Sequence, residues 1–151
     1  MRRALLALTG VLVTLIASGC GSSVRLDEPE ISGPEAEMCA ALMADLPETV
    51  LDQKRRPTDP GRNSAAWGRP PITLRCGVPE PQQMTPTSEC LEVNGVGWFD
   101  QPGTGGRVFT TLGRDVFVEV AVPSDHAPEA GALTFVADAI DRNVPQHTPC
   151  V

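Results

Sequence analysis

The sequence predicts an α+β fold of two layers: an antiparallel sheet of four or five strands with two helices packed on one of its faces. Three observations lead to this prediction. A segment with helical periodicity stands at each end of the folded region, segments with alternating apolar residues lie between them, and the connections between those segments are short. Short connections favour antiparallel pairing of successive strands. We expect one domain over residues 34–151, which is enough chain for a hydrophobic core.

The first helix is expected to start at Pro34, because proline suits the first turn of a helix, and to end before Pro47. Its apolar residues recur at helical spacing and share one face: Cys39, Leu42, Met43 and Leu46. The stretch 52–71 is rich in Pro, Gly and Arg and predicts a long loop.

The strands are predicted from alternation and from the turns between them. The expected segments are strands at 72–78, 107–112 and 116–122, loops at 79–88 and 100–106, and a turn at 113–115. Asn94 and Gly95 stand between two apolar arms and predict a tight hairpin, because both residues tolerate positive φ. The segment 116–122 has a valine at every second position and is the clearest strand.

A second helix is expected after these strands. Ser124 or Asp125 is its predicted cap, with Pro128 and Glu129 in the first turn. Its apolar stripe is Leu133, Val136, Ala137 and Ile140, and its end is set by Asn143 and Pro145. Because both helices cover the same sheet face in this scheme, we expect them to be neighbours.

The N-terminal stretch has the layout of a secretory signal peptide, expected over residues 1–19. Two arginines precede an apolar run of about 14 residues, which as a helix would span ~21 Å, short of the ~30 Å core of a bilayer. The end of this run, LIASGC at residues 15–20, resembles the lipobox of bacterial lipoproteins. The resemblance implies that Cys20 is acylated and anchors the chain in the lipid bilayer, at the outer face of the cytoplasmic membrane. A plain secreted protein and an uncleaved signal anchor are the alternatives.

The residues after the signal peptide are acidic overall. Residues 20–33 are polar and lack periodicity, so we expect a flexible tether there. The whole chain has 12 Lys and Arg against 19 Asp and Glu, and loss of Arg2 and Arg3 with the signal peptide brings the net charge from −7 to about −9. This charge argues against nucleic acid as a partner.

Four cysteines remain once Cys20 is assigned to lipid, and export favours two disulfides among them. Three pairings are open, and the expected neighbourhood of the helices favours Cys39–Cys150 with Cys76–Cys90. One observation weakens the second bond: if Leu91 and Val93 face the core, Cys90 points away from it. No metal site is expected, because no Cys or His spacing is typical of zinc.

The candidate ligand-binding residues are Trp67, Arg75 and Trp98. Arg75 is expected on the strand face opposite Leu74, where it would line a shallow site with a tryptophan if helices leave that face open. The alternative is that the tryptophans complete the core and Arg75 pairs with an acidic neighbour.

A basic cluster stands inside this acidic protein: Lys54, Arg55, Arg56, Arg62 and Arg69. It is a candidate site for an anionic envelope polymer or for lipid headgroups, and the alternative is a solvated loop. His126 and His147 have no neighbours that suggest a catalytic triad. Residues 103–106 lack the Lys and Ser/Thr of a phosphate loop. We therefore expect no catalytic residues and no cofactor.

Three motifs together resemble a family. They are WGRPPITLRCG at 67–77, VNGVGW at 93–98, and Gly113-Arg114 ahead of the valine-rich strand. They resemble an actinobacterial family of exported proteins known as domain of unknown function 3515, over about residues 38–142. The resemblance implies an actinobacterial envelope protein and brings no activity or catalytic residues with it.

We expect, from these observations, a lipid-anchored module of the cell envelope that binds a protein or glycan partner and has no catalytic role. Two alternatives stay open. One is a small envelope hydrolase or ligand carrier with a pocket that the sequence does not reveal. The other is a structural lipoprotein without a small ligand.

Overall fold

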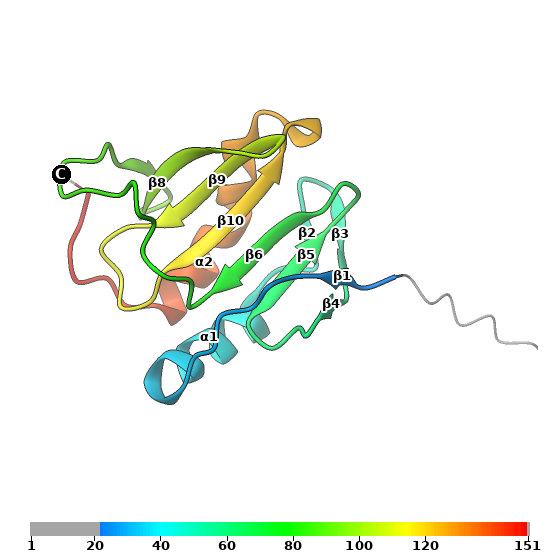
Figure 1. The fold of residues 1–151 in the computed structure, drawn as a ribbon, viewed down its shortest axis with the longest axis horizontal. Helices are drawn as coiled ribbons and strands as arrows, with labels where there is room; N and C mark the ends of the chain where they lie inside the picture. The colour runs from blue at the N-terminus through cyan, green and yellow to red at the C-terminus, as the bar shows by residue number, and fades with distance from the viewer. Residues whose placement is uncertain (1–21, 151) are drawn as a thin grey trace, which may run out of the picture.

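The computed structural model describes residues 22–150, so the predicted signal peptide (residues 1–19), Cys20 and Val151 lie outside the described range. Its main element is an antiparallel sheet of eight strands in the order β2-β3-β5-β6-β10-β9-β8-β7 (Figure 1). These strands are β2 (Thr49–Val50), β3 (Gln53–Arg56), β5 (Ser64–Trp67), β6 (Ile72–Cys76), β7 (Leu91–Val93), β8 (Val96–Gly103), β9 (Gly106–Thr111) and β10 (Val118–Pro123). A second sheet pairs β1 (Val24–Arg25) with β4 (Thr58–Asp59) in parallel.

The predicted fold class, a two-layer domain with four or five strands and two helices packed on one face, is wrong. The large sheet has eight strands, and a parallel two-stranded sheet accompanies it. Three of the missed strands, β3, β4 and β5, lie within residues 52–71, where the sequence predicts a loop. β3 is polar along its length, with three consecutive cations after Gln53, and β5 is buried along its length, so neither shows the alternation of a strand with one face in water.

The two α-helices within residues 22–150 are α1 (Gly33–Asp45) and α2 (Leu133–Asn143). α1 has proline in its first turn, as predicted, and the chain leaves the helical conformation at Leu46, the residue before Pro47. The predicted start of the second helix is too early, because two 3-10 turns, η1 (Ser124–His126) and η2 (Glu129–Ala132), come first. Ala127 between them is extended, since a following proline disfavours the α conformation.

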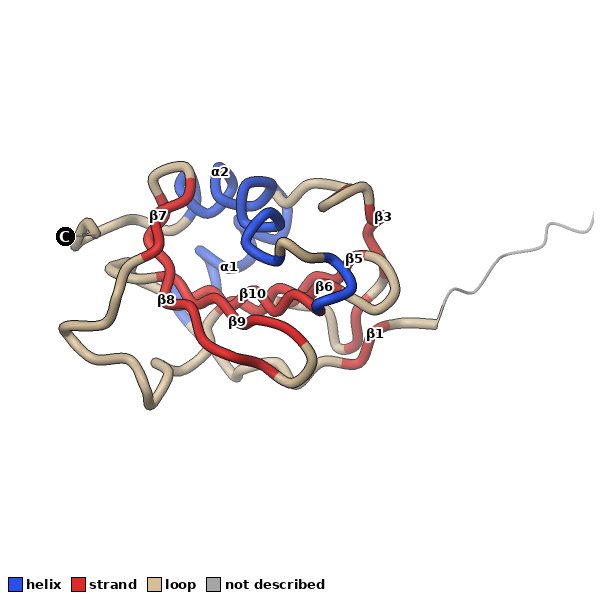
Figure 2. The backbone as a smooth tube through the Cα atoms, turned by 90° about the horizontal axis from the view of Figure 1, so that it is seen from above, coloured by secondary structure: helices blue, strands red, loops and turns tan. Residues whose placement is uncertain are grey.

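One hydrophobic core joins the sheet to both helices. Its fully buried members include Leu42 of α1, Ile72 and Leu74 of β6, Val118 and Val120 of β10, and Leu133 and Ile140 of α2. In Figure 1 α2 lies behind β10, and in Figure 2 it lies on the side of the large sheet away from β1. The opposite face of β5 and β6 is therefore available to the N-terminal part of the chain.

The hairpin predicted at Asn94-Gly95 is confirmed. Both residues have positive φ, 48° and 78°, and Val93 pairs with Val96 across the turn. The loop predicted at 100–106 is much shorter, because β8 and β9 continue until Gly103 pairs with Gly106. Only Thr104 and Gly105 remain in that turn.

Within residues 22–150 two disulfides are present, and they join other pairs than those predicted. Cys39 bonds Cys76, and Cys90 bonds Cys150, so the predicted Cys39–Cys150 and Cys76–Cys90 bonds are wrong. Cys39 on α1 and Cys76 on β6 face the same core, and both are 0% exposed. The sulfurs of Cys90 and Cys150 instead lie over Gly97, on the other face of β8 from Trp98. The face of the sheet on which each sulfur lies decides the pairing.

Asp45 at the end of α1 and Arg142 at the end of α2 form an ion pair of 2.9 Å. The hydrogen bond from Arg142, with a second one from Asn143, holds the pKa of the Asp45 carboxyl below its ordinary value. A carboxyl whose pKa is lowered by folding stabilises the fold above its unfolded pKa of ~3.9, and that contribution is lost as the pH falls through the lower, folded pKa. We expect an NMR titration of Asp45 to show a lowered midpoint that rises toward the ordinary value in Arg142→Gln. A midpoint that this substitution does not move would contradict the assignment.

Candidate functional site

The N-terminal strap, residues 22–31, crosses the face of β5 and β6 that points away from α2 (Figure 1). Residues 20–33 are predicted to form a flexible tether, whereas residues between Ser22 and Pro29 are hydrogen-bonded to β3, β5 and β6, to β4 and to the loops between these strands. Val24 and Leu26 alternate with charged residues and are half-buried, which is the one local signal that could have indicated this strap.

The first half of the strap is held by arginines and by β4. Arg56 donates to the carbonyl oxygen of Ser22 at 2.9 Å, and Arg69 donates to the Ser22 hydroxyl at 3.2 Å. The backbone N–H groups of Val24 and Leu26 then donate to carbonyl oxygens of Pro57 and Asp59. These bonds fix the point at which the chain enters the domain.

The second half is held by polar side chains of β5 and β6 and by Asn63, the residue before β5. Arg75 donates to the carbonyl oxygen of Asp27 at 2.8 Å, and the Ser64 hydroxyl donates to the carboxylate of Glu28. Buried Asn63 donates to the carbonyl oxygen of Pro29 at 3.2 Å and to that of Cys76 at 2.9 Å. An anchored amide of this kind fixes the height of the strap above the sheet.

The predicted ligand-binding trio of Trp67, Arg75 and Trp98 does not come together. Both tryptophans are 0% exposed on the core side of the sheet, and the Trp67 indole N–H donates to the carbonyl oxygen of Pro47 at 2.9 Å. Arg75 points to the opposite face, as the alternation of a strand requires, where it binds Glu119 at 2.7 Å and the strap. The alternative interpretation of these three residues therefore describes their environment.

The arginines of the predicted basic cluster have different hydrogen-bond partners and lie in three different places. Arg55 donates to the carbonyl oxygens of Met43 (3.1 Å) and Leu46 (3.3 Å) and so completes the hydrogen bonding at the end of α1. Arg56 and Arg69 hold Ser22. Arg62 is exposed beside the strap, and its backbone N–H donates to Glu28 at 3.2 Å.

Both histidines bind backbone carbonyl oxygens. The Nε2 atom of His126 lies 2.8 Å from the carbonyl oxygen of Pro70, and Nε2 of His147 lies 3.1 Å from that of Arg114. Within residues 22–150, no group of three His, Cys, Asp or Glu side chains is placed to hold a metal ion. The helices of that range also fall short of the length and apolarity that a membrane span needs.

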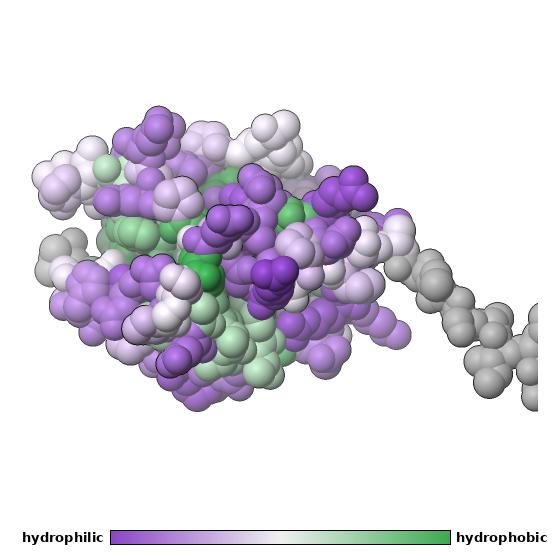
Figure 3. Space-filling model, turned by 60° about the horizontal axis from the view of Figure 1, so that its bottom comes forward, coloured by the Kyte–Doolittle hydropathy of each residue, from purple (hydrophilic) through white to green (hydrophobic). Residues whose placement is uncertain are grey.

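A hollow of about 760 Å³ lies between the strap, α1 and the loop after β4. Its apolar part is formed by Ile31, Ala36 and Ala40, and charged groups of Glu28, Glu30 and Arg62 stand around it. Figure 3 shows the molecule with its lower side turned forward, and hydrophobic surface gathers in the middle of this view among hydrophilic side chains. This strap hollow offers an apolar contact next to charged hydrogen-bonding groups, an arrangement typical of a binding surface.

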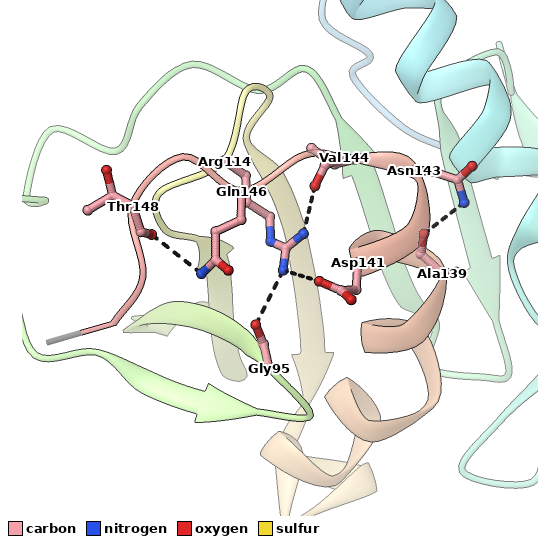
Figure 4. A network of polar contacts seen from close by, with 8 residues as sticks. All are labelled: Gly95, Arg114, Ala139, Asp141, Asn143, Val144, Gln146 and Thr148. Carbon is pink, nitrogen blue, oxygen red and sulfur yellow. Dashed lines mark hydrogen bonds and ion pairs between the residues drawn. The ribbon is translucent and has the colours of Figure 1, made fainter.

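Arg114 is a buried cation that the sequence marks only as part of a motif. Its side chain is 0% exposed and donates to three groups: the carbonyl oxygen of Val144 at 2.6 Å, that of Gly95 at 3.3 Å and the carboxylate of Asp141 at 2.8 Å (Figure 4). These partners belong to the C-terminal tail, the β7–β8 turn and α2. A buried guanidinium thus joins three segments that are far apart in the chain.

Gly113, the residue before Arg114, has a φ of +63°, and a Cβ there would lie 1.9 Å from the carbonyl oxygen of Thr148. We expect Gly113→Ala to lower the free energy of unfolding by more than the ~1–3 kcal/mol that a left-handed alanine costs, because the tail must also move. The matched control is Gly105→Ala, since Gly105 has a φ of +75° with no atom within 4 Å of the added Cβ. Thermal unfolding of both variants separates the cost of the left-handed backbone from the cost of the steric clash with the tail. Equal losses of stability in the two variants would show that the clash with the tail contributes nothing.

Comparison with known proteins agrees with the resemblance predicted from the motifs. A family model described as "Protein of unknown function (DUF3515)" matches residues 3–149. No curated protein and no solved structure matches the chain.

Proposed function

The chain belongs to the DUF3515 family of proteins of unknown function, and from this premise we propose that it is a lipid-anchored, non-catalytic accessory module of an actinobacterial cell envelope. In this proposal it is held at the outer face of the cytoplasmic membrane by acylated Cys20. It binds an envelope protein or glycan through the domain that follows.

The pairing of the cysteines carries this proposal. Cys39, Cys76, Cys90 and Cys150 form two disulfides, which are typical of exported proteins. Of the five cysteines in the sequence, Cys20 is the one that these two bonds do not include. Its position directly after an apolar run and three small residues supports lipid as the group that it carries. Two acyl chains are enough for stable anchoring.

The strap hollow supports the binding role. It combines the apolar side chains of Ile31, Ala36 and Ala40 with the carboxylates of Glu28 and Glu30. A protein or glycan surface can bury an apolar group on the first set and donate hydrogen bonds to the second.

The anchor is tested by the intact mass and peptide map of protein extracted from membranes. We expect a mature chain that begins at diacylglyceryl-modified Cys20, and a Cys20→Ser variant that carries no lipid. Ser23→Ala is the matched control, because it changes an exposed residue near the anchor and should leave the modification in place. An unmodified Cys20, or a chain that retains Met1, would refute the anchor.

The binding role is tested by photo-cross-linking in intact cells. We expect a photoreactive residue at Ala40 in the strap hollow to capture a specific protein or glycan, and one at exposed Asp138 on α2 to capture it less. Ile31→Asp, which places a charge on the apolar part of the hollow, should reduce the capture at Ala40. Equal capture at both positions, or none, would refute this surface.

A further inference from the structure

We propose that the anchor corner, formed by Arg25, Arg56 and Arg69 around Ser22, binds anionic lipid headgroups and so holds the domain in one orientation on the membrane. This inference rests on the proposed lipid anchor at Cys20. It goes beyond it by assigning a lipid-binding surface to the folded domain itself.

The length of chain between the proposed anchor and the domain is the first argument. Ser22 follows Cys20 by two residues, and consecutive Cα atoms are 3.8 Å apart, so the Cα atoms of the two residues lie within ~8 Å of each other. A free tether over residues 20–33 would reach several times farther, at up to ~3.5 Å per residue. Lipid attached at Cys20 therefore brings the anchor corner to the level of the headgroups.

The fixation of Ser22 is the second argument. Arg56 binds its carbonyl oxygen and Arg69 binds its hydroxyl, while β1 begins at Val24 and pairs with β4. In Figure 1 the described chain enters the fold at this point, next to β1 and β4. The domain is thus attached through a short, hydrogen-bonded connection, which restricts the orientations that it can take.

Charge is the third argument. The four ion pairs within residues 22–150 use Arg75, Arg107, Arg114 and Arg142. The three arginines of the anchor corner take part in none of these pairs, and Arg25 and Arg69 are exposed. Asp59 stands opposite Arg25 in the β1–β4 register but forms no ion pair with it in the described part of the chain.

The domain outside the anchor corner is acidic, and this contrast in charge favours one orientation on an anionic membrane. From Cys20 onward the chain has 10 Lys and Arg against 19 Asp and Glu, so an anionic membrane repels most of the domain. Cations near such a surface are attracted to it within a Debye length. When the anchor corner faces the membrane, its cations are attracted to the anionic surface and the acidic remainder of the domain lies farther away from it.

The two tryptophans of the chain are built-in reporters of this orientation. Trp67 lies two residues before Arg69, while Trp98 lies on β8, four strand positions away from β5 in the sheet. With strands ~4.8 Å apart, the two side chains are separated by about 19 Å across the sheet. Trp98→Phe leaves Trp67 as the only indole, and Trp67→Phe leaves Trp98.

The experiment couples the oxidised chain from Cys20 onward, which contains every described residue and both disulfides, to vesicles that carry a maleimide lipid. With Cys39–Cys76 and Cys90–Cys150 formed, Cys20 supplies the thiol for coupling, so the coupling replaces acylation and works whether or not the cell acylates Cys20. Energy transfer from each single tryptophan to a dansyl headgroup lipid is measured on phosphatidylglycerol-containing and on pure phosphatidylcholine vesicles.

We expect the ratio of Trp67 transfer to Trp98 transfer to be higher on the anionic vesicles and to fall in high salt. Arg25→Gln with Arg69→Gln should remove this increase, since each cation near an anionic surface contributes about five-fold and two contribute roughly 30-fold to the preferred orientation. Arg62→Gln with Arg142→Gln removes the same charge elsewhere and should keep the increase.

An equal ratio on the two kinds of vesicle, or the same loss in both double variants, would overturn the lipid-binding corner while leaving the anchor at Cys20 untouched. An unacylated Cys20 in cells would refute the proposed anchor but would not change the result of the vesicle experiment on the anchor corner. If a Trp→Phe variant fails to fold, the total transfer from both tryptophans is compared between the two kinds of vesicle for the wild-type chain and for the two double variants, and only Arg25→Gln with Arg69→Gln should remove the difference.

Discussion

Replacement of Cys39 and Cys76 by alanine is expected to lower the free energy of unfolding by about 4 kcal/mol or more. The bond closes a loop with a sequence separation of 37 residues, for which loop-closure entropy alone gives ~3.8 kcal/mol. Both sulfurs are also fully buried between α1 and β6, so their removal takes contacts out of the core. The expected loss is therefore larger than the entropic value.

The matched control is Cys90→Ala with Cys150→Ala, followed by urea unfolding of both double variants. Its loop has a sequence separation of 60 residues, which gives a slightly larger entropic cost of ~4.3 kcal/mol. However, Cys90 and Cys150 are only half-buried and hold the C-terminal tail. If core packing matters as we infer, the first variant loses more stability than the second. A larger loss in the control would show that loop length dominates.

The second large effect is expected at Arg114. Arg114→Met should lower the free energy of unfolding by about 3 kcal/mol, because it leaves the carbonyl oxygens of Val144 and Gly95 without their donor. Loss of the ion pair with Asp141 adds little to this destabilisation, since the Asp141 side chain is 59% exposed and water can hydrate its carboxylate. The loss comes from unpaired backbone acceptors and from the detached tail.

Arg142→Met provides the comparison, measured by the same urea titration. Arg142 also binds an aspartate, but its side chain is 59% exposed, and exposed ion pairs contribute about 0–1 kcal/mol. Amide hydrogen exchange is a second measurement of the same effect. Loss of Arg114 should speed exchange at His147 and Thr148, whose N–H groups donate to the carbonyl oxygen of Gly113. Similar losses in the two variants, with unchanged exchange in the tail, would contradict this role.

Local signals in the sequence predicted several elements well. Pro34 in the first turn of α1, the turn at Asn94-Gly95 and the valines of β10 each depend on a few neighbouring residues. The family was also indicated by short motifs. Such features can be predicted from the sequence because backbone preferences and side-chain alternation depend on only a few neighbouring residues.

The candidate sites were predicted less well. Arg75 was placed on the correct strand face, yet its partners, Glu119 and the strap carbonyl of Asp27, are 44 and 48 residues away. The sequence suggests both tryptophans as ligand contacts, but they are core residues. Whether a residue on a known face meets solvent, ligand or another segment depends on what covers that face.

The sequence by itself determined the acidic charge, the lipobox-like stretch before Cys20, the two helical segments and the valine strand, because composition and short-range periodicity are written directly in it. Only the tertiary structure decided the eight-stranded sheet, the disulfide pairing, the burial of Arg114 and the strap over β5 and β6. Each of these depends on contacts between residues far apart in the chain. β5 shows the reason most clearly: with the core on one face and the strap on the other, burial of both faces removes the alternation by which a strand is predicted.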